Sequence, residues 1–229
     1  MTSAQSPSLP GSAPRIWLIA FGVIALILSG SLYLSSQLKH NLPRPALPVY
    51  SVIQHDLEAT ERSGQPVHFS DLKGKVTTCA YIYTVCPHGC AAVIGQMKKL
   101  HDAFGTRSDF HQISISVIPE RDTASFLSAY AQGLGLADSD PWWFLSGQQK
   151  PLWDFMTNEL KLEPAKAIPE DERVNPLDLF EHDLRIVLID RQSRVRGYYS
   201  VFHPEPEIAA LMCERLFKDT ERLLNHPND

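Results

Sequence analysis

The feature that most constrains this chain is an uncharged segment close to its amino terminus. No Asp, Glu, Lys or Arg occurs between Ile16 and Leu38, and the core of the segment, IWLIAFGVIALIL, is apolar without interruption. A bilayer hydrocarbon core of about 30 Å requires roughly 20 apolar residues in a helix. Trp17 and Tyr33 lie near the two ends, where amphipathic rings favour the membrane interface. The segment therefore predicts a transmembrane anchor over residues 15–38.

A cleavable signal peptide is the alternative to an anchor. The apolar stretch is longer than the usual hydrophobic region of a signal peptide, about 7–15 residues, and no clean Ala-x-Ala cleavage pattern follows it. We therefore expect the segment to stay in place. Its orientation does not follow from flanking charge, because Arg15 precedes it while Lys39 and Arg44 follow it.

The rest of the chain predicts two short accessory segments and one domain. Residues 1–14, rich in Ser, Pro and Ala, predict a disordered tail, and residues 39–48 predict a semi-rigid Pro-rich linker. Residues 49–229 suit one domain, since domains usually run to about 100–200 residues. The net charge is −5 and there is no long basic run, which argues against nucleic acid as the main partner.

The apolar pattern after residue 49 predicts an α/β fold. Residues 76–85 are dense in β-branched and aromatic residues, as in a strand buried on both faces. Apolar residues then recur at helical spacing over residues 91–104. A turn is expected at Ser63-Gly64, ahead of these elements. After them come a strand at 111–118, a helix capped by Asp122 or Thr123, a strand or loop at 140–147, a helix at 151–160, a hairpin of 184–190 with 195–201, and a helix at 206–224. Asp122 is the favoured cap, and it would shape the loop near Cys86 and Cys90. This order predicts a thioredoxin-like fold with a mixed central sheet, preceded by one transmembrane helix.

The segment CPHGC lies at the junction of the buried strand with the first helix, and its first and last residues are Cys86 and Cys90. A helix amino terminus favours thiolate over thiol, so Cys86 and Cys90 could bind one metal ion or close into a disulfide. Soft thiolates select Cu(I), Zn(II) or iron–sulfur clusters, and two of them need a further ligand. A redox dithiol of the thioredoxin type has CxxC spacing instead. Cys79 and Cys213, in apolar surroundings, are expected to be small core residues.

Three segments together resemble the Sco (SenC) family of cytochrome oxidase copper-assembly proteins. They are GKVTTCAYIYTVCPHGC, SVIPERDT and FEHDLRIVLIDRQSRVRGYY, at residues 74–90, 116–123 and 180–199. The family carries a CPxxC motif after its first core strand and a ligand His before a strand similar to ILID, and these positions match Cys86, Cys90 and His182. The sequence departs from the family at His88, where an acidic residue is frequent, at Ala91, which replaces Pro, and at Ile118, which replaces Asp.

The resemblance implies that Cys86, Cys90 and His182 bind copper as Cu(I) or Cu(II). It implies delivery of that copper to the copper-site subunit of cytochrome c oxidase or another copper-receiving protein, or reduction of that site's cysteines. The protein would then be a metallochaperone without turnover of its own, on the periplasmic or an equivalent non-cytoplasmic side of the membrane. His88 is either a solvent-facing residue or an auxiliary ligand or proton acceptor.

Two enzymatic functions are alternatives. A membrane-anchored thiol–disulfide oxidoreductase would use Cys86 and Cys90 as a redox dithiol on client cysteines, with copper incidental. A peroxidase related to peroxiredoxins would need an Arg-assisted Cys in a TxxC setting, which Thr84-Val85-Cys86 does not supply. A structural disulfide or two inert thiols are the non-functional alternatives for the cysteine pair.

Overall fold

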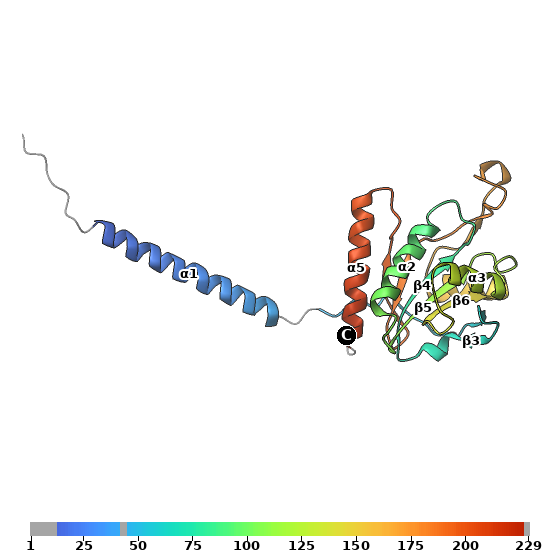
Figure 1. The fold of residues 1–229 in the computed structure, drawn as a ribbon, viewed down its shortest axis with the longest axis horizontal. Coiled ribbons are helices and arrows are strands. Elements are labelled where there is room, and N and C mark those ends of the chain that lie inside the picture. Colours follow the sequence, from blue (N-terminus) through green and yellow to red (C-terminus); the bar gives the residue numbers. More distant parts are fainter. Residues whose placement is uncertain (1–12, 42–44, 227–229) are drawn as a thin grey trace, which may run out of the picture. The chain divides into compact units, whose positions relative to one another are not determined.

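The computed structural model describes residues 13–41 and 45–226, and the chain divides into two compact units, Met1–Ala46 and Leu47–Asp229 (Figure 1). The predicted disordered tail lies outside the described residues over 1–12, and so does the part of the predicted linker at 42–44.

Helix α1 (Ala13–Asn41) occupies the first unit. Among the described residues it is the one helix long and apolar enough to cross a membrane, over Ile16–Ser36. Length and composition support this assignment, and a signal sequence near an amino terminus shares both properties.

The second unit is built on a mixed sheet. Within residues 45–226 the sheet has eight strands in the order β1-β10-β9-β4-β5-β6-β2-β3. The bounds are Ser51–Val52 for β1, Glu58–Glu61 for β2, Pro66–His68 for β3, Val76–Ile82 for β4, Phe110–Ser116 for β5, Trp142–Ser146 for β6, Ile186–Ile189 for β9 and Arg194–Tyr199 for β10. Strand β5 pairs in parallel with both β4 and β6, and the other neighbours are antiparallel. The predicted mixed α/β fold is confirmed.

Strand β4 at the centre of the sheet is buried along its whole length. Because side chains alternate between the faces of a strand, Ala80 and Ile82 enter one hydrophobic cluster while Cys79 and Tyr81 enter the other. Strand β5 is also fully buried, which matches the near-continuous apolar runs expected of parallel strands covered on both sides.

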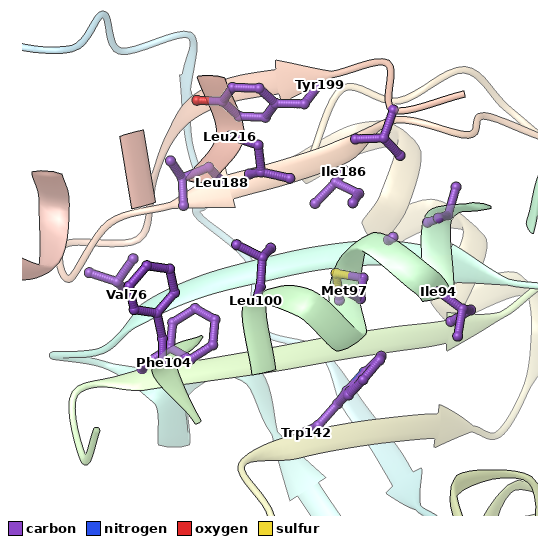
Figure 2. Packing of buried hydrophobic residues seen from close by; sticks show 14 of the residues in the cluster. Val76, Ile94, Met97, Leu100, Phe104, Trp142, Ile186, Leu188, Tyr199 and Leu216 are labelled. Carbon is purple, nitrogen blue, oxygen red and sulfur yellow. The ribbon is translucent and has the colours of Figure 1, made fainter. Parts of the chain in front are cut away.

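Helices cover both faces of this sheet. The cluster shown in Figure 2 joins α2 (Cys90–Phe104) and α5 (Pro206–Asn225) to the sheet, with Met97 and Leu100 of α2 and Leu216 of α5 fully buried. Helix α3 (Ala124–Gly133) adds Leu127 to the same cluster. The opposite face is covered by the short helices η1 (Phe69–Leu72), α4 (Gln149–Asp154) and η2 (Phe155–Glu159). The predicted helix at 151–160 thus consists of an α-helical turn continued as a π-helix.

Two local predictions have opposite outcomes. Gly64 has φ +83° in the turn between β2 and β3, which confirms the turn signal at Ser63-Gly64. The specific assignment of Asp122 as a helix cap is wrong, because the Thr123 hydroxyl accepts the N–H of Phe126 at the start of α3. Thr123 is the extended residue that directly precedes the helix, so its side chain is the one that can reach the free N–H groups.

A short excursion separates η2 from β9. Strands β7 (Lys166–Ala167) and β8 (Phe180–Glu181) pair as an antiparallel ribbon, with the 3-10 turn η3 (Glu170–Glu172) between them. In Figure 1 this orange segment projects beyond the main sheet. It leads directly into His182.

Candidate metal centre

The loop between β4 and α2 carries both cysteines of the CPHGC segment. Cys86 is half-buried, and its N–H donates to the carbonyl of Tyr83 at 3.0 Å. Cys90 is the first residue of α2 and is buried. A buried strand followed at once by an amphipathic helix therefore places one sulfur before the helix and the other in its first turn.

Gly89 allows the segment that carries His182 to approach this loop. A Cβ at this position would lie 2.5 Å from Cδ1 of Phe202 and 2.7 Å from Cδ1 of Leu184. Both distances are below ordinary van der Waals contact, so the close packing of Leu184 and Phe202 against the start of α2 depends on the missing side chain.

His182 is oriented by its own backbone neighbourhood. Its Nδ1 lies 3.0 Å from the carbonyl oxygen of Asp183, which can only accept, so Nδ1 carries the proton. Nε2 then lies 3.1 Å from Sγ of Cys90. The ring is also held at its edges by Tyr81 and Tyr83, with centroids at 5.6 and 5.9 Å. A ligand His typically has its second nitrogen engaged in this way.

One donor atom each from Cys86, Cys90 and His182 lies within 4.8 Å of the other two. Metal bonds of about 2.0 Å to nitrogen and 2.3 Å to sulfur keep three such donors roughly 4 Å apart, so a small inward adjustment would close the group around one ion. The donor set is two sulfurs and one imidazole, which suits copper. The three residues that the sequence singled out are thus brought together.

The two cysteines have opposite proton affinities. Hydrogen bonds to the Cys86 sulfur, chiefly from the Cys90 thiol and then from the backbone N–H groups of His88 and Cys90, lower the pKa of Cys86 to about 4 against the opposing effect of burial. The same bond to Cys86, together with burial, raises the pKa of Cys90. In the metal-free protein, Cys86 is therefore the thiolate and Cys90 the proton donor.

Asp122 supports the loop that leads from β4 to Cys86. Its buried carboxylate accepts hydrogen bonds from the Thr84 hydroxyl at 2.6 Å and the Ser116 hydroxyl at 2.8 Å. Burial raises the pKa of Asp122, and these bonds partly offset that effect. The carboxylate therefore joins the loop that leads to Cys86 with the end of β5. The sequence located Asp122 near the site but missed this role, since Thr84 is 38 residues away.

Two residues of the cysteine loop, Tyr83 and His88, tie the β7–β8 excursion to it. The Tyr83 hydroxyl donates to the carbonyl of Leu177 and accepts the N–H of Leu179 at 2.8 Å. His88 Nε2 lies 3.1 and 3.2 Å from the two carboxylate oxygens of Asp178. Asp178 and Tyr83 were not predicted, because no spacing in the sequence relates residues about 90 positions apart.

A cavity of about 330 Å³ opens beside the cysteine loop. Cys86, His88, Asp178 and His182 are among its lining residues. Cys79 lies outside this group, fully buried with Sγ 3.9 Å from Sδ of Met156, as a core residue should be.

Cys213 is only half-buried at the edge of the α2–α5 cluster. The sequence had placed it in the core; its neighbour on α5, Leu211, is 57% exposed, so the apolar face of that helix is narrower at this point than the sequence indicated.

Comparison with known proteins matches this chain to one family. The model of the SCO1/SenC family matches residues 49–216. A SCO1/SenC family lipoprotein from Bacillus anthracis str. Ames is 25% identical, with 78% of this chain and 99% of that chain covered and a TM-score of 0.64. ScoI of Bradyrhizobium japonicum, solved with copper bound, is 26% identical, with coverages of 71% and 98% and a TM-score of 0.55.

BsSco, described as a member of the Sco family of cytochrome c oxidase assembly proteins, shares the fold at 22% identity, with coverages of 78% and 97% and a TM-score of 0.61. Among curated protein sequences there is no significant match. The family model spans most of the chain and includes the whole candidate centre, and the chain belongs to the SCO1/SenC family.

Proposed function

We propose that this protein is a membrane-anchored copper chaperone that binds one copper ion through Cys86, Cys90 and His182. The observation that carries the proposal is the convergence of two sulfurs and one imidazole nitrogen within 4.8 Å. Thiolate and imidazole together suit copper. The copper-bound structure of Bradyrhizobium japonicum ScoI supports copper as the ion carried.

The same geometry suits release of the ion to another protein. Three protein ligands leave the coordination sphere open, so an incoming ligand can bind before one of the chaperone's own ligands leaves. Cys86 is half-exposed, whereas Cys90 is buried. Exchange would therefore begin at Cys86. The recipient that we propose is the copper-site subunit of a respiratory cytochrome c oxidase, in keeping with the assembly role ascribed to BsSco.

Helix α1 would hold the copper-binding domain at a membrane, with that domain on the periplasmic or equivalent non-cytoplasmic side. The support is the length and composition of Ile16–Ser36 and the description of the Bacillus anthracis relative as a lipoprotein. An uncleaved anchor predicts an intact amino terminus by mass spectrometry and resistance to alkaline extraction. Digestion of the domain by protease added to spheroplasts would establish its side; a cleaved amino terminus would identify a signal peptide.

The copper site is tested by titrating the full chain in detergent, reduced and metal-free, with Cu(I) in competition with a chromophoric chelator. Wild-type protein should bind one equivalent. Each of Cys86→Ala, Cys90→Ala and His182→Ala removes one of three ligands, so the affinity should fall at least about 100-fold. Cys213→Ala, a half-buried cysteine outside the group, is the matched control and should bind as wild type. Binding that is indifferent to His182 would contradict the three-ligand site.

A thiol–disulfide reductase is the second candidate, and the proton distribution of the two cysteines favours it. The Cys86 thiolate would attack a client disulfide and release one client thiolate. Cys90 would then lose its proton and attack Cys86 Sγ, which releases the second client thiolate and leaves a Cys86–Cys90 disulfide. Two electrons thus pass to the client. His182→Ala separates the two functions, because a reductase should retain most of its activity whereas copper binding should be lost.

A further inference from the structure

His88 and Asp178 form a pair whose geometry differs from that of a solvated surface histidine. Asp178 is almost completely buried, with 1% of its side chain exposed, while 45% of the His88 side chain is exposed. Both carboxylate oxygens of Asp178 accept a hydrogen bond from His88, with Nε2 at 3.1 and 3.2 Å from them. The carboxylate also accepts the N–H of Val174 at 3.1 Å. A buried carboxylate is therefore used to fix the orientation of a half-exposed imidazole.

Another His–Asp pair in the same domain provides the contrast. His68 Nδ1 lies 3.6 Å from an oxygen of Asp56, and both side chains are about half exposed, at 48% and 43%. That pair is an ordinary surface contact between two solvated groups. The buried, two-oxygen acceptor at Asp178 is instead the arrangement that proteins use behind metal-bound histidines, where the outer ring nitrogen donates to a carboxylate and the inner one binds the metal.

His88 lies within reach of an ion held by Cys86. Its backbone N–H donates to Sγ of Cys86, with nitrogen and sulfur 3.4 Å apart. The first atom of the imidazole ring, Cγ, is only three bonds from that nitrogen. His88 and His182 both line the cavity beside Cys86. The ring is outside the group of three mutually close donors, so it would join that group only when an ion draws it in.

We propose that His88, positioned by Asp178, is a fourth ligand recruited by Cu(II) but not by Cu(I). The inference rests on the proposed copper site of Cys86, Cys90 and His182 and deepens it. Cu(II) favours tetragonal coordination with nitrogen ligands, whereas the soft Cu(I) ion is served by the sulfurs. With Nε2–H committed to Asp178, Nδ1 is the ring atom that can bind the ion. The centre would thus hold Cu(I) with three ligands and Cu(II) with four.

The test uses the full chain in detergent, loaded separately with Cu(I) and with Cu(II). Pulsed electron paramagnetic resonance of the Cu(II) form counts the coordinated imidazoles, and a competition titration measures each affinity. His88→Gln removes the imidazole but retains an amide N–H that can donate to Asp178. His68→Gln is the matched control, because it removes a similarly exposed imidazole beside an aspartate remote from the cavity.

Wild-type protein and His68→Gln should show two coordinated imidazoles, and His88→Gln should show one. Cu(II) affinity should fall at least about tenfold in His88→Gln while Cu(I) affinity stays within about twofold. Asp178→Asn keeps the shape of the side chain but weakens its hydrogen bonds from His88 and from the N–H of Val174. It should weaken Cu(II) binding by about 10–100-fold, the usual range when the partner of a ligand histidine is lost.

A single imidazole in wild-type protein, or a His88→Gln signal identical to that of wild type, would overturn the inference and leave the three-ligand site intact. A protein that binds Cu(I) but no Cu(II) would have the same consequence. A wild-type chain that binds neither ion would remove the proposed function as well.

Discussion

Three cysteines of this domain show how surroundings decide the chemistry of one residue type. Hydrogen bonds at the start of α2 lower the pKa of Cys86, whereas burial raises the pKa of the Cys213 thiol on α5 and of the Cys79 thiol in β4. The thiolate is the reactive and metal-binding form, so reactivity should follow this order.

The first prediction concerns alkylation of the reduced, metal-free protein. With a pKa of about 4, Cys86 should react with iodoacetamide at close to its maximal rate already at pH 6, because the fraction of thiolate no longer rises with pH. Cys213, whose pKa is raised by burial, should react much more slowly at pH 6, and its rate should keep rising with pH. Peptide mapping by mass spectrometry after timed quenching measures both rates in one sample. If the alkylation rates of Cys86 and Cys213 depended on pH in the same way, the hydrogen bonds around Cys86 would not be stabilising its thiolate.

At the scale of elements, the site depends on two loops that are tied to the sheet by side chains. Asp122 binds the loop after β4 to the end of β5 through Thr84 and Ser116. The Tyr83 hydroxyl holds the β7–β8 excursion through the backbone of Leu179. These contacts orient the segments on which the donor atoms lie. Asp122 and Tyr83 should therefore influence metal affinity although neither is one of the three proposed ligands.

The second prediction compares two adjacent residues at the start of α3. Asp122→Ala leaves two hydroxyls near the site without their acceptor, so we expect a loss of about 1–3 kcal/mol in the free energy of unfolding. We also expect weaker Cu(I) binding, because the loop before Cys86 is released. Thr123→Ala removes the helix cap and should cost about 0.5–2 kcal/mol with Cu(I) affinity unchanged.

Urea unfolding and the chelator competition measure the two quantities for both variants. Equal effects of Asp122→Ala and Thr123→Ala on Cu(I) affinity would mean that Asp122 acts only through helix α3.

At the scale of the whole domain, charged groups close the end of the sheet opposite the candidate centre. Strands β4 and β5 are parallel, and Asp109 directly precedes β5, whereas Cys86 follows the far end of β4. The Asp109 carboxylate accepts from Arg107 at 2.9 and 3.1 Å and from Arg191 at 2.6 Å. The same arginines donate to carbonyls of Leu223 and Leu224 in α5. This cluster joins three segments that are distant in sequence.

The third prediction concerns acid sensitivity. The hydrogen bond from Arg107, and then that from Arg191, lower the pKa of Asp109 from 3.8 to about 2. Since the folded-state pKa is depressed, the carboxylate stabilises the fold above about pH 4, and this contribution disappears as the pH falls to about 2. It amounts to at most about 2 kcal/mol, because the side chain is partly exposed and solvent screens the pairs.

Asp109→Asn should lower stability at pH 7 and flatten the dependence of stability on pH between 4 and 2, as measured by chemical unfolding at each pH. An unchanged slope in the variant would assign the acid sensitivity to other carboxylates.

The sequence predicted the elements that carry the site because their signals are local. The buried strand at 76–85 and the helix at 91–104 follow from periodicity, and the observed bounds, Val76–Ile82 and Cys90–Phe104, differ from them by a few residues. Failures occurred where two residues compete for one role, as with Asp122 and Thr123. Periodicity also could not distinguish the π-helical η2 from a continued α-helix, since the two differ in which carbonyls the same N–H groups reach.

By itself the sequence determined the apolar amino-terminal helix, the α/β order of the domain and the placement of Cys86 and Cys90 at a strand–helix junction, because nearest-neighbour chemistry and periodicity decide these features. The resemblance to a family singled out His182. Only the tertiary structure decided that His182 Nε2 meets Cys90 Sγ, that Gly89 leaves room for Leu184 and Phe202, and that a buried Asp178 orients His88. Those contacts join residues 90 or more positions apart, and the geometry of the two histidines depends on how the β7–β8 excursion packs against the cysteine loop.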